Sequence, residues 1–187
     1  MTDYRFLRTD QDIQRSFIEL LQTKDFNNLT ITNVISQAMI SRPTFYAHFD
    51  GLYDLAQKSI TTALEPFRVL FKQALAEKVQ KKEGFSLSNI YPFLFQQVSD
   101  TLIAKHTEYL VIRKLPLGTN SFDQQLKKEL IKLLDTYFGY SQTNLQTTML
   151  TSILLGNIDY VLKNQKVPTL EEVQTCLTNI LGLITRN

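Results

Sequence analysis

Residues 30–49 read TITNVISQAMISRPTFYAHF, and this stretch decides the fold of the N-terminal part of the chain. Its first half carries apolar residues at the spacing of one helix face, which predicts a short helix over about 31–38. These apolar residues are Ile31, Val34, Ile35 and Ala38. Met39 and Ile40 follow as the turn.

The second half of the stretch predicts another short helix that begins after Ser41. A serine hydroxyl can accept hydrogen bonds from the free N–H groups of a first helical turn. Pro43 falls in that turn, where a missing N–H costs little. Phe45 and Phe49 lie four residues apart and are expected to be buried. Four polar side chains are then left for solvent or for DNA: Arg42, Thr44, Tyr46 and His48. Two short helices joined by a tight turn are the pattern of a helix-turn-helix.

Helical periodicity also dominates the sequence on both sides of this stretch. Upstream, Ile13, Phe17, Leu20 and Leu21 share one helix face, and Thr9 with Asp12 resembles a capping box at the start of that helix. Pro66 falls inside a long apolar pattern and is expected to kink it. Downstream helices are predicted at about 52–81, 88–105, 108–113, 122–137, 142–164 and 169–185. No alternating strand pattern of useful length remains, so the predicted fold is all-α with about nine helices.

The composition is that of an ordinary globular protein with 187 residues, 43% of them hydrophobic and 20% charged. Neither a signal-peptide-like start nor an apolar run of membrane-spanning length is present. We therefore expect a cytoplasmic protein without a membrane partner. The single cysteine, Cys176, excludes an intramolecular disulfide and is expected to be buried as a small apolar residue.

Charge gives the DNA interpretation no support. Residues 1–50 contain five Lys/Arg and six Asp/Glu, a net charge of −1, whereas strong nucleic-acid binders usually carry a basic surface. The prediction of DNA binding therefore depends on the geometry of the motif.

The stretch from Thr9 to Leu55 resembles the DNA-binding domain of the TetR/AcrR family of transcriptional regulators. The run Thr44–Phe49 is the most specific part of that resemblance, which strongly covers about a quarter of the chain. The matching residues are Phe26, Leu29, Thr30, Ile31, Ala38, Ser41, Thr44, Phe45, Tyr46, His48 and Phe49.

The resemblance implies a helix-turn-helix DNA-binding domain over residues 1–50 and a helical effector-binding and dimerisation domain over 51–187. Arg42 and Thr44 would face the major groove, where an arginine can pair with guanine O6 and N7. Tyr46, His48, Thr30 and Thr32 would contact phosphates, which fix register without reading sequence. The full predicted DNA-binding set is Arg8, Thr9, Thr30, Thr32, Ser41, Arg42, Pro43, Thr44, Tyr46 and His48.

Two positions depart from the family pattern. Met39 stands where the family often has glycine, and a methionine at positive φ would be strained, so another turn shape is expected. Leu52 stands where the family often has a lysine that contacts a phosphate. With one phosphate contact fewer, the log–log slope of affinity against salt should be lower by about 0.9.

The resemblance also implies a homodimer and a ligand cavity. The last two helices would form a four-helix interface with a second copy. Thr148, Ser152 and Gly156 are spaced to allow close helix approach there, although packing within the subunit is nearly as good an explanation. The aromatic residues predict a small apolar or planar effector. The candidate pocket residues are Phe67, Phe71, Phe93, Tyr109, Phe122 and Tyr137, and aromatics at this spacing are also typical of a plain core.

Catalysis has little support, because the chain has only two histidines and one cysteine and lacks a glycine-rich phosphate loop or a zinc-ligand cluster. We expect no catalytic residue, metal or cofactor, and His106 is expected to be a solvated helix-end residue.

The leading hypothesis is a homodimeric, ligand-responsive repressor of operator DNA. The alternative is a TetR-like protein whose helical half binds a partner protein and acts as an activator or cofactor. The Arg-Pro-Thr-Phe-Tyr run is similar to regulators of sugar-kinase operons, which supports keeping this alternative. A well-packed core with an exposed apolar groove would favour the partner protein.

Overall fold

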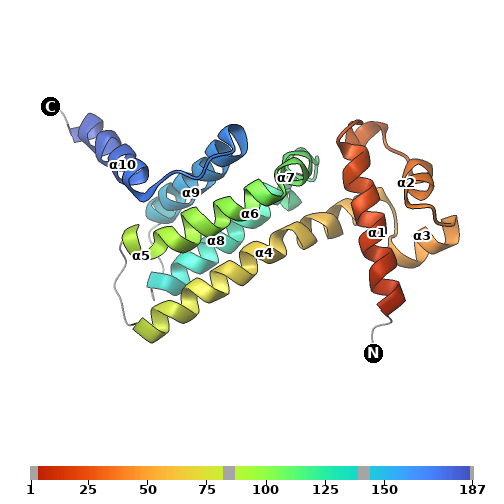
Figure 1. The fold of residues 1–187 in the computed structure, drawn as a ribbon, viewed down its shortest axis with the longest axis horizontal. Coiled ribbons are helices and arrows are strands. Elements are labelled where there is room, and N and C mark those ends of the chain that lie inside the picture. Colours follow the sequence, from red (N-terminus) through yellow and green to blue (C-terminus); the bar gives the residue numbers. More distant parts are fainter. Residues whose placement is uncertain (1–3, 82–86, 139–143, 186–187) are drawn as a thin grey trace. The chain divides into compact units, whose positions relative to one another are not determined.

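A computed structural model describes residues 4–81, 87–138 and 144–185, and every regular element in these ranges is helical (Figure 1). The α-helices are α1 (Tyr4–Leu21), α2 (Ile31–Ala38), α3 (Arg42–His48), α4 (Leu52–Lys81), α5 (Leu87–Tyr91), α6 (Val98–Ala104), α7 (His106–Ile112), α8 (Phe122–Phe138), α9 (Asn144–Asn164) and α10 (Leu170–Thr185). The other helical segments are the 3₁₀ turns η1 (Phe26–Asn28) and η3 (Gly118–Asn120) and the π-helical stretch η2 (Pro92–Gln97).

The segments α5, η2 and α6 follow one another without a break, and η2 is a π-helical stretch within that run. Pro92 begins the stretch and has no N–H to donate to a preceding turn, which is one cause of such widening. Counting the run as one helix gives nine helices in the described residues, and the all-α prediction is confirmed.

Most predicted helix positions are confirmed to within a few residues, but the predicted start of the first helix is wrong. Thr9 lies inside α1, which is already helical at Tyr4. Thr9 and Asp12 have the spacing of a capping box but lie inside α1, because capping residues also occur within helices. The ring of Phe6 stacks on that of His48 with centroids 3.9 Å apart, so a tertiary contact stabilises the early turns of α1.

The chain forms two compact units, one made of residues 1–65 and 107–126, the other of 66–106 and 127–187. Helices α4 and α8 each contribute to both units, and α4 passes from one to the other at Pro66. This division describes packing, and the predicted functional boundary between residues 50 and 51 stays a prediction.

In the first unit, α1 packs against α2, and α2 packs against α3. The fully buried side chains Ile13, Phe17, Val34 and Phe45 form the centre of this three-helix arrangement. The unit also contains α7 and the start of α8, which are joined by two hydrogen bonds from Arg113 to Asp123 at 2.7 and 2.8 Å.

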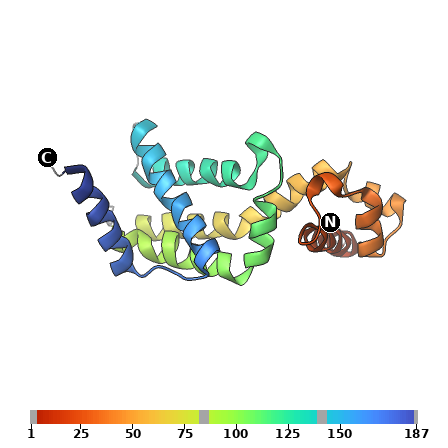
Figure 2. The same ribbon diagram turned by 90° about the horizontal axis from the view of Figure 1, so that it is seen from above.

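In the second unit, α4, α6 and α8 lie side by side in both views, and α9 packs against α6 (Figures 1 and 2). Arg68 on α4 pairs with Glu129 on α8 at 2.9 Å. The predicted capping box of α10 is present: Thr169 N donates to Glu172 at 2.7 Å, and Glu172 N donates to Thr169 Oγ1 at 3.1 Å. Hydrogen bonds from Lys166 and the Thr169 backbone lower the pKa of the Glu172 carboxyl.

His106 differs from its expected solvated role. It begins α7 and is half-buried, and its Nε2 donates to the carbonyl of Leu162 at 2.8 Å. The ring therefore satisfies one of the carbonyls left free near the C-terminal end of α9. Among the described helices, none is long and apolar enough to cross a membrane.

Candidate nucleic-acid interface

Helices α2 and α3 form the predicted helix-turn-helix, and a capping side chain fixes the start of each. Thr30 caps α2 in a reciprocal box: Asn33 N donates to Thr30 Oγ1 at 3.2 Å, and Thr30 N donates to Asn33 Oδ1 at 3.0 Å. Ser41 Oγ accepts a hydrogen bond from Thr44 N at 3.2 Å, which confirms the predicted cap of α3. The two helix starts are therefore set by local chemistry rather than by distant contacts.

The turn between the helices does contain a methionine in the left-handed region, so the expectation of another turn shape is wrong. Met39 has φ 53° and ψ 43°. Ile40 N donates to Ile35 O at 3.2 Å, and Met39 N approaches Ser36 O at 3.4 Å, the pattern of a Schellman motif. The hydrogen bonds that close α2 hold Met39 in this conformation, while its side chain is 92% exposed.

The faces of α3 separate as the sequence predicts, apart from His48, which is buried, and Thr44, which is half-buried. Phe45 and Phe49 are buried and join α3 to the core of the first unit. Arg42 and Pro43 are exposed, Tyr46 is 48% exposed, and Thr44 is half-buried. The outward side of α3 thus presents a guanidinium and a phenol.

His48 is only 8% exposed, so its expected position in solvent is wrong. Its ring lies between Phe6 and Phe49, with centroid distances of 3.9 and 6.2 Å. Its Nδ1 lies 3.4 Å from Asp10 Oδ1. The earlier start of α1 brings Phe6 onto this ring beside Asp10, and the apolar periodicity of residues 13–21 does not extend to that first turn. His48 links α3 to α1, and a direct phosphate contact from its ring stays a prediction.

Lys58 was also missed as a supporting residue. Its Nζ donates to the carbonyl of His48 at 2.8 Å, pairs with Asp54 at 3.1 Å and lies 4.8 Å from the centre of the Phe49 ring. A lysine near the C-terminus of a helix suits the negative end of its dipole. Lys58 lies ten positions after His48, on the next helix, so the motif of α2 and α3 did not include it.

The hydroxyls of Thr30 and Thr32 already have partners within the chain. Thr30 Oγ1 donates to Asn33 Oδ1 at 2.9 Å, and Thr32 Oγ1 accepts from Arg42 Nη2 at 3.3 Å. Thr44 and Ser41 also share a contact between their hydroxyl oxygens at 2.7 Å. The signal for the Thr30 partner was present in the sequence, because Asn33 lies three residues after the cap.

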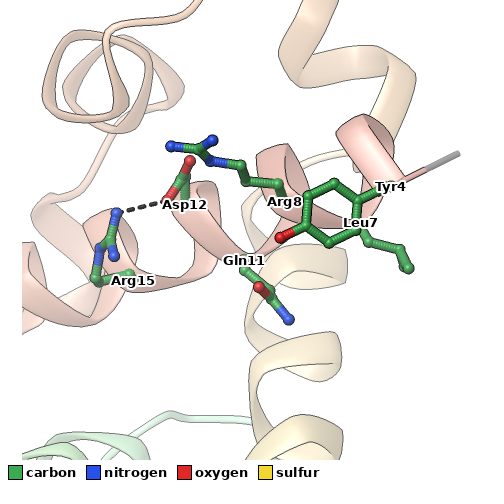
Figure 3. A pocket seen from close by; sticks show the side chains of 6 residues that line it. All are labelled: Tyr4, Leu7, Arg8, Gln11, Asp12 and Arg15. Atoms are coloured by element: carbon green, nitrogen blue, oxygen red, sulfur yellow. Dashed lines mark hydrogen bonds and ion pairs between the residues drawn. The ribbon is translucent and has the colours of Figure 1, made fainter.

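The first turns of α1 carry the remaining predicted contacts, Arg8 and Thr9. Arg8 is exposed and Thr9 is half-buried. Arg8 borders an open surface recess of about 370 Å³ whose six lining side chains all come from α1 (Figure 3). In this recess Arg15 pairs with Asp12 at 2.5 Å. Arg8 and Arg15 are two turns apart on one side of the helix, although Asp12 offsets part of their charge.

The six predicted pocket residues are divided between the two packing units. Tyr109 and Phe122 are buried in the first unit, with ring centroids 5.6 Å apart, and burial raises the pKa of the Tyr109 hydroxyl. Phe67 and Phe71 are buried in the second unit, where Phe93 is half-buried. The side chain of Tyr137, on α8, lies outside the described part. Packing is the role the structure gives the four buried residues, and an effector pocket here stays a prediction.

A different, exposed cavity lies on α9 and α10 within the second unit. We call it the α9–α10 groove; it has a volume of about 360 Å³. It is lined by Phe95, Ile153, Gly156, Asn157, Tyr160, Pro168, Glu172, Val173, Cys176, Leu177 and Ile180. Cys176 is exposed in this groove, so its predicted burial is wrong: the described residues do not fully cover the side of α10 on which it lies.

Gly156 also faces this open surface. A Cβ added to it would meet no atom within 4 Å, and Thr148 and Ser152 are exposed as well. Packing of these three residues within the subunit, which the sequence left open, is therefore not what the described chain shows.

A scan against protein-family models finds no match for this chain, and a search of characterised proteins finds no similar sequence. In the described residues, no group of three or more His, Cys, Asp or Glu side chains could hold a metal ion.

Proposed function

We propose that the protein is a sequence-specific regulator that binds double-stranded operator DNA through α2 and α3, as its resemblance to TetR-type regulators implies. The observation that carries this proposal is the geometry of α3. Its buried side is anchored by Phe45 and Phe49, while Arg42 and Tyr46 project from the other side. A short helix with a capped start and an exposed arginine in its first turn has the form of a recognition helix, whose N-terminal residues contact base edges.

Arg42 carries a positive charge on the exposed side of α3. In the part of the chain that the structure describes, no carboxylate lies within ion-pair distance of its guanidinium. The free charge suits a base contact in the electronegative major groove. Tyr46, one turn along α3, would contact a phosphate and set the register of the helix.

The protein would act as a homodimer, because a two-fold dimer can place two recognition helices on two half-sites. Support comes from exposed apolar side chains on α9 and α10, which solvent would otherwise cover. These are Leu145, Met149, Ile153, Tyr160 and Ile180. The unfilled space beside Gly156 adds to this support, since a bare glycine allows a second helix to approach closely.

A second function would use the α9–α10 groove in place of the homodimer contact on the same residues: the helical half would bind a partner protein there instead of a small effector. The groove is open and mostly apolar, whereas four predicted pocket aromatics are packed in the interior. A small apolar or aromatic effector remains the signal under the repressor hypothesis.

The first experiment selects duplexes from a random DNA pool with the full-length protein, then measures affinity for the best sequence. Tyr46→Ala should weaken binding at least tenfold, because it removes a contact that positions α3. Val69→Ala is the matched control, since Val69 on α4 is 50% exposed against 48% for Tyr46. Failure of the wild-type protein to enrich any sequence at low salt would overturn the proposal.

A further inference from the structure

Arg42 is held by a side chain from the neighbouring helix. Its Nη2 donates to Thr32 Oγ1 at 3.3 Å across the turn. Arg42 is the first residue of α3 and Thr32 the second residue of α2. Because both helix starts are fixed by their caps at Thr30 and Ser41, this hydrogen bond joins two anchored points.

The contact leaves most of the guanidinium available. An arginine has five N–H donors, and a bidentate contact to guanine O6 and N7 needs two of them. The hydrogen bond to Thr32 uses one donor, and a neutral hydroxyl leaves the positive charge in place. A carboxylate in the same position would have cancelled that charge.

Positioning matters because arginine is long and flexible. A free arginine loses much rotamer freedom when it binds a base, and a side chain that is already oriented loses less. Orientation by Thr32 would therefore favour the one base whose acceptors fit the held guanidinium. It would add nothing for bases that cannot form the bidentate contact.

We propose that Thr32 is a specificity-determining positioning residue of the DNA interface, whose hydroxyl orients Arg42 toward a base edge. This inference rests on the proposed function. It replaces the phosphate contact that the sequence predicted for Thr32 with a role inside the protein. The two roles have different signatures, because phosphate contacts affect the salt dependence and base contacts affect the sequence preference.

The experiment uses the full-length protein and the duplex selected by the wild type, with each base pair of one half-site substituted in turn. The position at which Arg42→Ala no longer discriminates between bases is the position that Arg42 reads. Thr32→Val keeps the shape of the side chain and removes the hydroxyl, whereas Thr32→Ser keeps the hydroxyl. Circular-dichroism melts check the fold, and Thr32→Ala replaces Thr32→Val if the valine shifts the melting temperature.

The expected result is a loss of preference at that base pair by about three- to tenfold in Thr32→Val, the range of one hydrogen bond. Thr32→Ser should keep the preference, and the slope of affinity against KCl should not change. In the Arg42→Ala background, Thr32→Val should have no further effect, because the two residues act as one unit. Arg8→Gln provides the contrast: it should lower the log–log slope of affinity against KCl by about 0.9 and leave the base preference unchanged.

Two results would overturn the inference. One is a lower salt slope in Thr32→Val with unchanged base preferences, which would make Thr32 a phosphate contact. The other is an effect of Thr32→Val that persists in full in the Arg42→Ala background. Absence of sequence selection by the wild type would instead overturn the proposed function itself, so the two failures are distinguishable.

Discussion

Replacing Met39 with glycine should stabilise the protein. Met39 has φ 53° and ψ 43°, a left-handed conformation that costs an L-residue about 1–2 kcal/mol. Glycine adopts it freely but adds about 0.4–1 kcal/mol of conformational freedom to the unfolded chain. Because the side chain is 92% exposed, little packing is lost. The net gain should be about 0.5–1 kcal/mol in the free energy of unfolding.

Urea denaturation followed by circular dichroism measures this gain, provided that the transition is cooperative. Met39→Ala is the matched control: it removes the side chain but keeps the left-handed cost, so its free energy of unfolding should be unchanged within about 0.3 kcal/mol. Ser36→Gly, at an exposed helical position of α2, should lose about 0.5 kcal/mol. If Met39→Gly is no more stable than Met39→Ala, the strain argument fails.

Three further substitutions, on α1, α4 and α9, each have a matched control. Phe6→Ala should lower the free energy of unfolding by about 1–2 kcal/mol, because it removes the stack on His48. Leu7→Ala is the control and should lower it less, although the two side chains are similarly exposed, Leu7 at 47% and Phe6 at 44%. Equal losses in urea titrations would contradict this role of Phe6. Leu52→Lys should steepen the log–log slope of DNA affinity against KCl by about 0.9, because it adds one phosphate contact. Thr62→Lys, further along α4, should leave the slope unchanged. A slope for Leu52→Lys identical to that of the wild type would show that position 52 does not approach the backbone of DNA. Ile153→Asp should shift the protein toward monomer in sedimentation experiments, because it places a charge on the exposed apolar side of α9. Val69→Asp, at a similarly exposed position on α4, should not. A dimer unaffected by Ile153→Asp would place the interface elsewhere.

Much of the fold could be predicted because its signals are local. The long helix α4 has the predicted bounds of 52 and 81, and the capping pairs at Ser41 and Thr169 fix two other helix starts. These features depend on residues within one or two turns of each other, so a single sequence contains them. The division of α3 into buried phenylalanines and exposed Arg42 and Tyr46 follows from the same short-range spacing.

Two of the errors have a different cause, which is the presence or absence of contact between distant segments. His48 is buried because Phe6 and Asp10 reach it from α1, about forty positions earlier in the chain. Cys176 is exposed because no segment of the described chain covers its side of α10. In these two cases a tertiary contact, or the lack of one, overrides a local preference. Met39 is a separate case, because the local hydrogen bonds that close α2 outweigh its own conformational preference.

Residues 1–50, the part proposed to bind DNA, carry little net charge. Residues 1–50 carry a net charge of −1, so nonspecific attraction to DNA supplies little binding free energy. In the proposed dimer, binding of the first recognition helix would hold the second near its half-site at high effective concentration. Affinity would then depend on the link between the two copies more strongly than in a basic protein. A ligand or partner that changes this link would change DNA affinity with no contact to α3. Because the α9–α10 groove lies at the proposed link, we expect the signal to bind there.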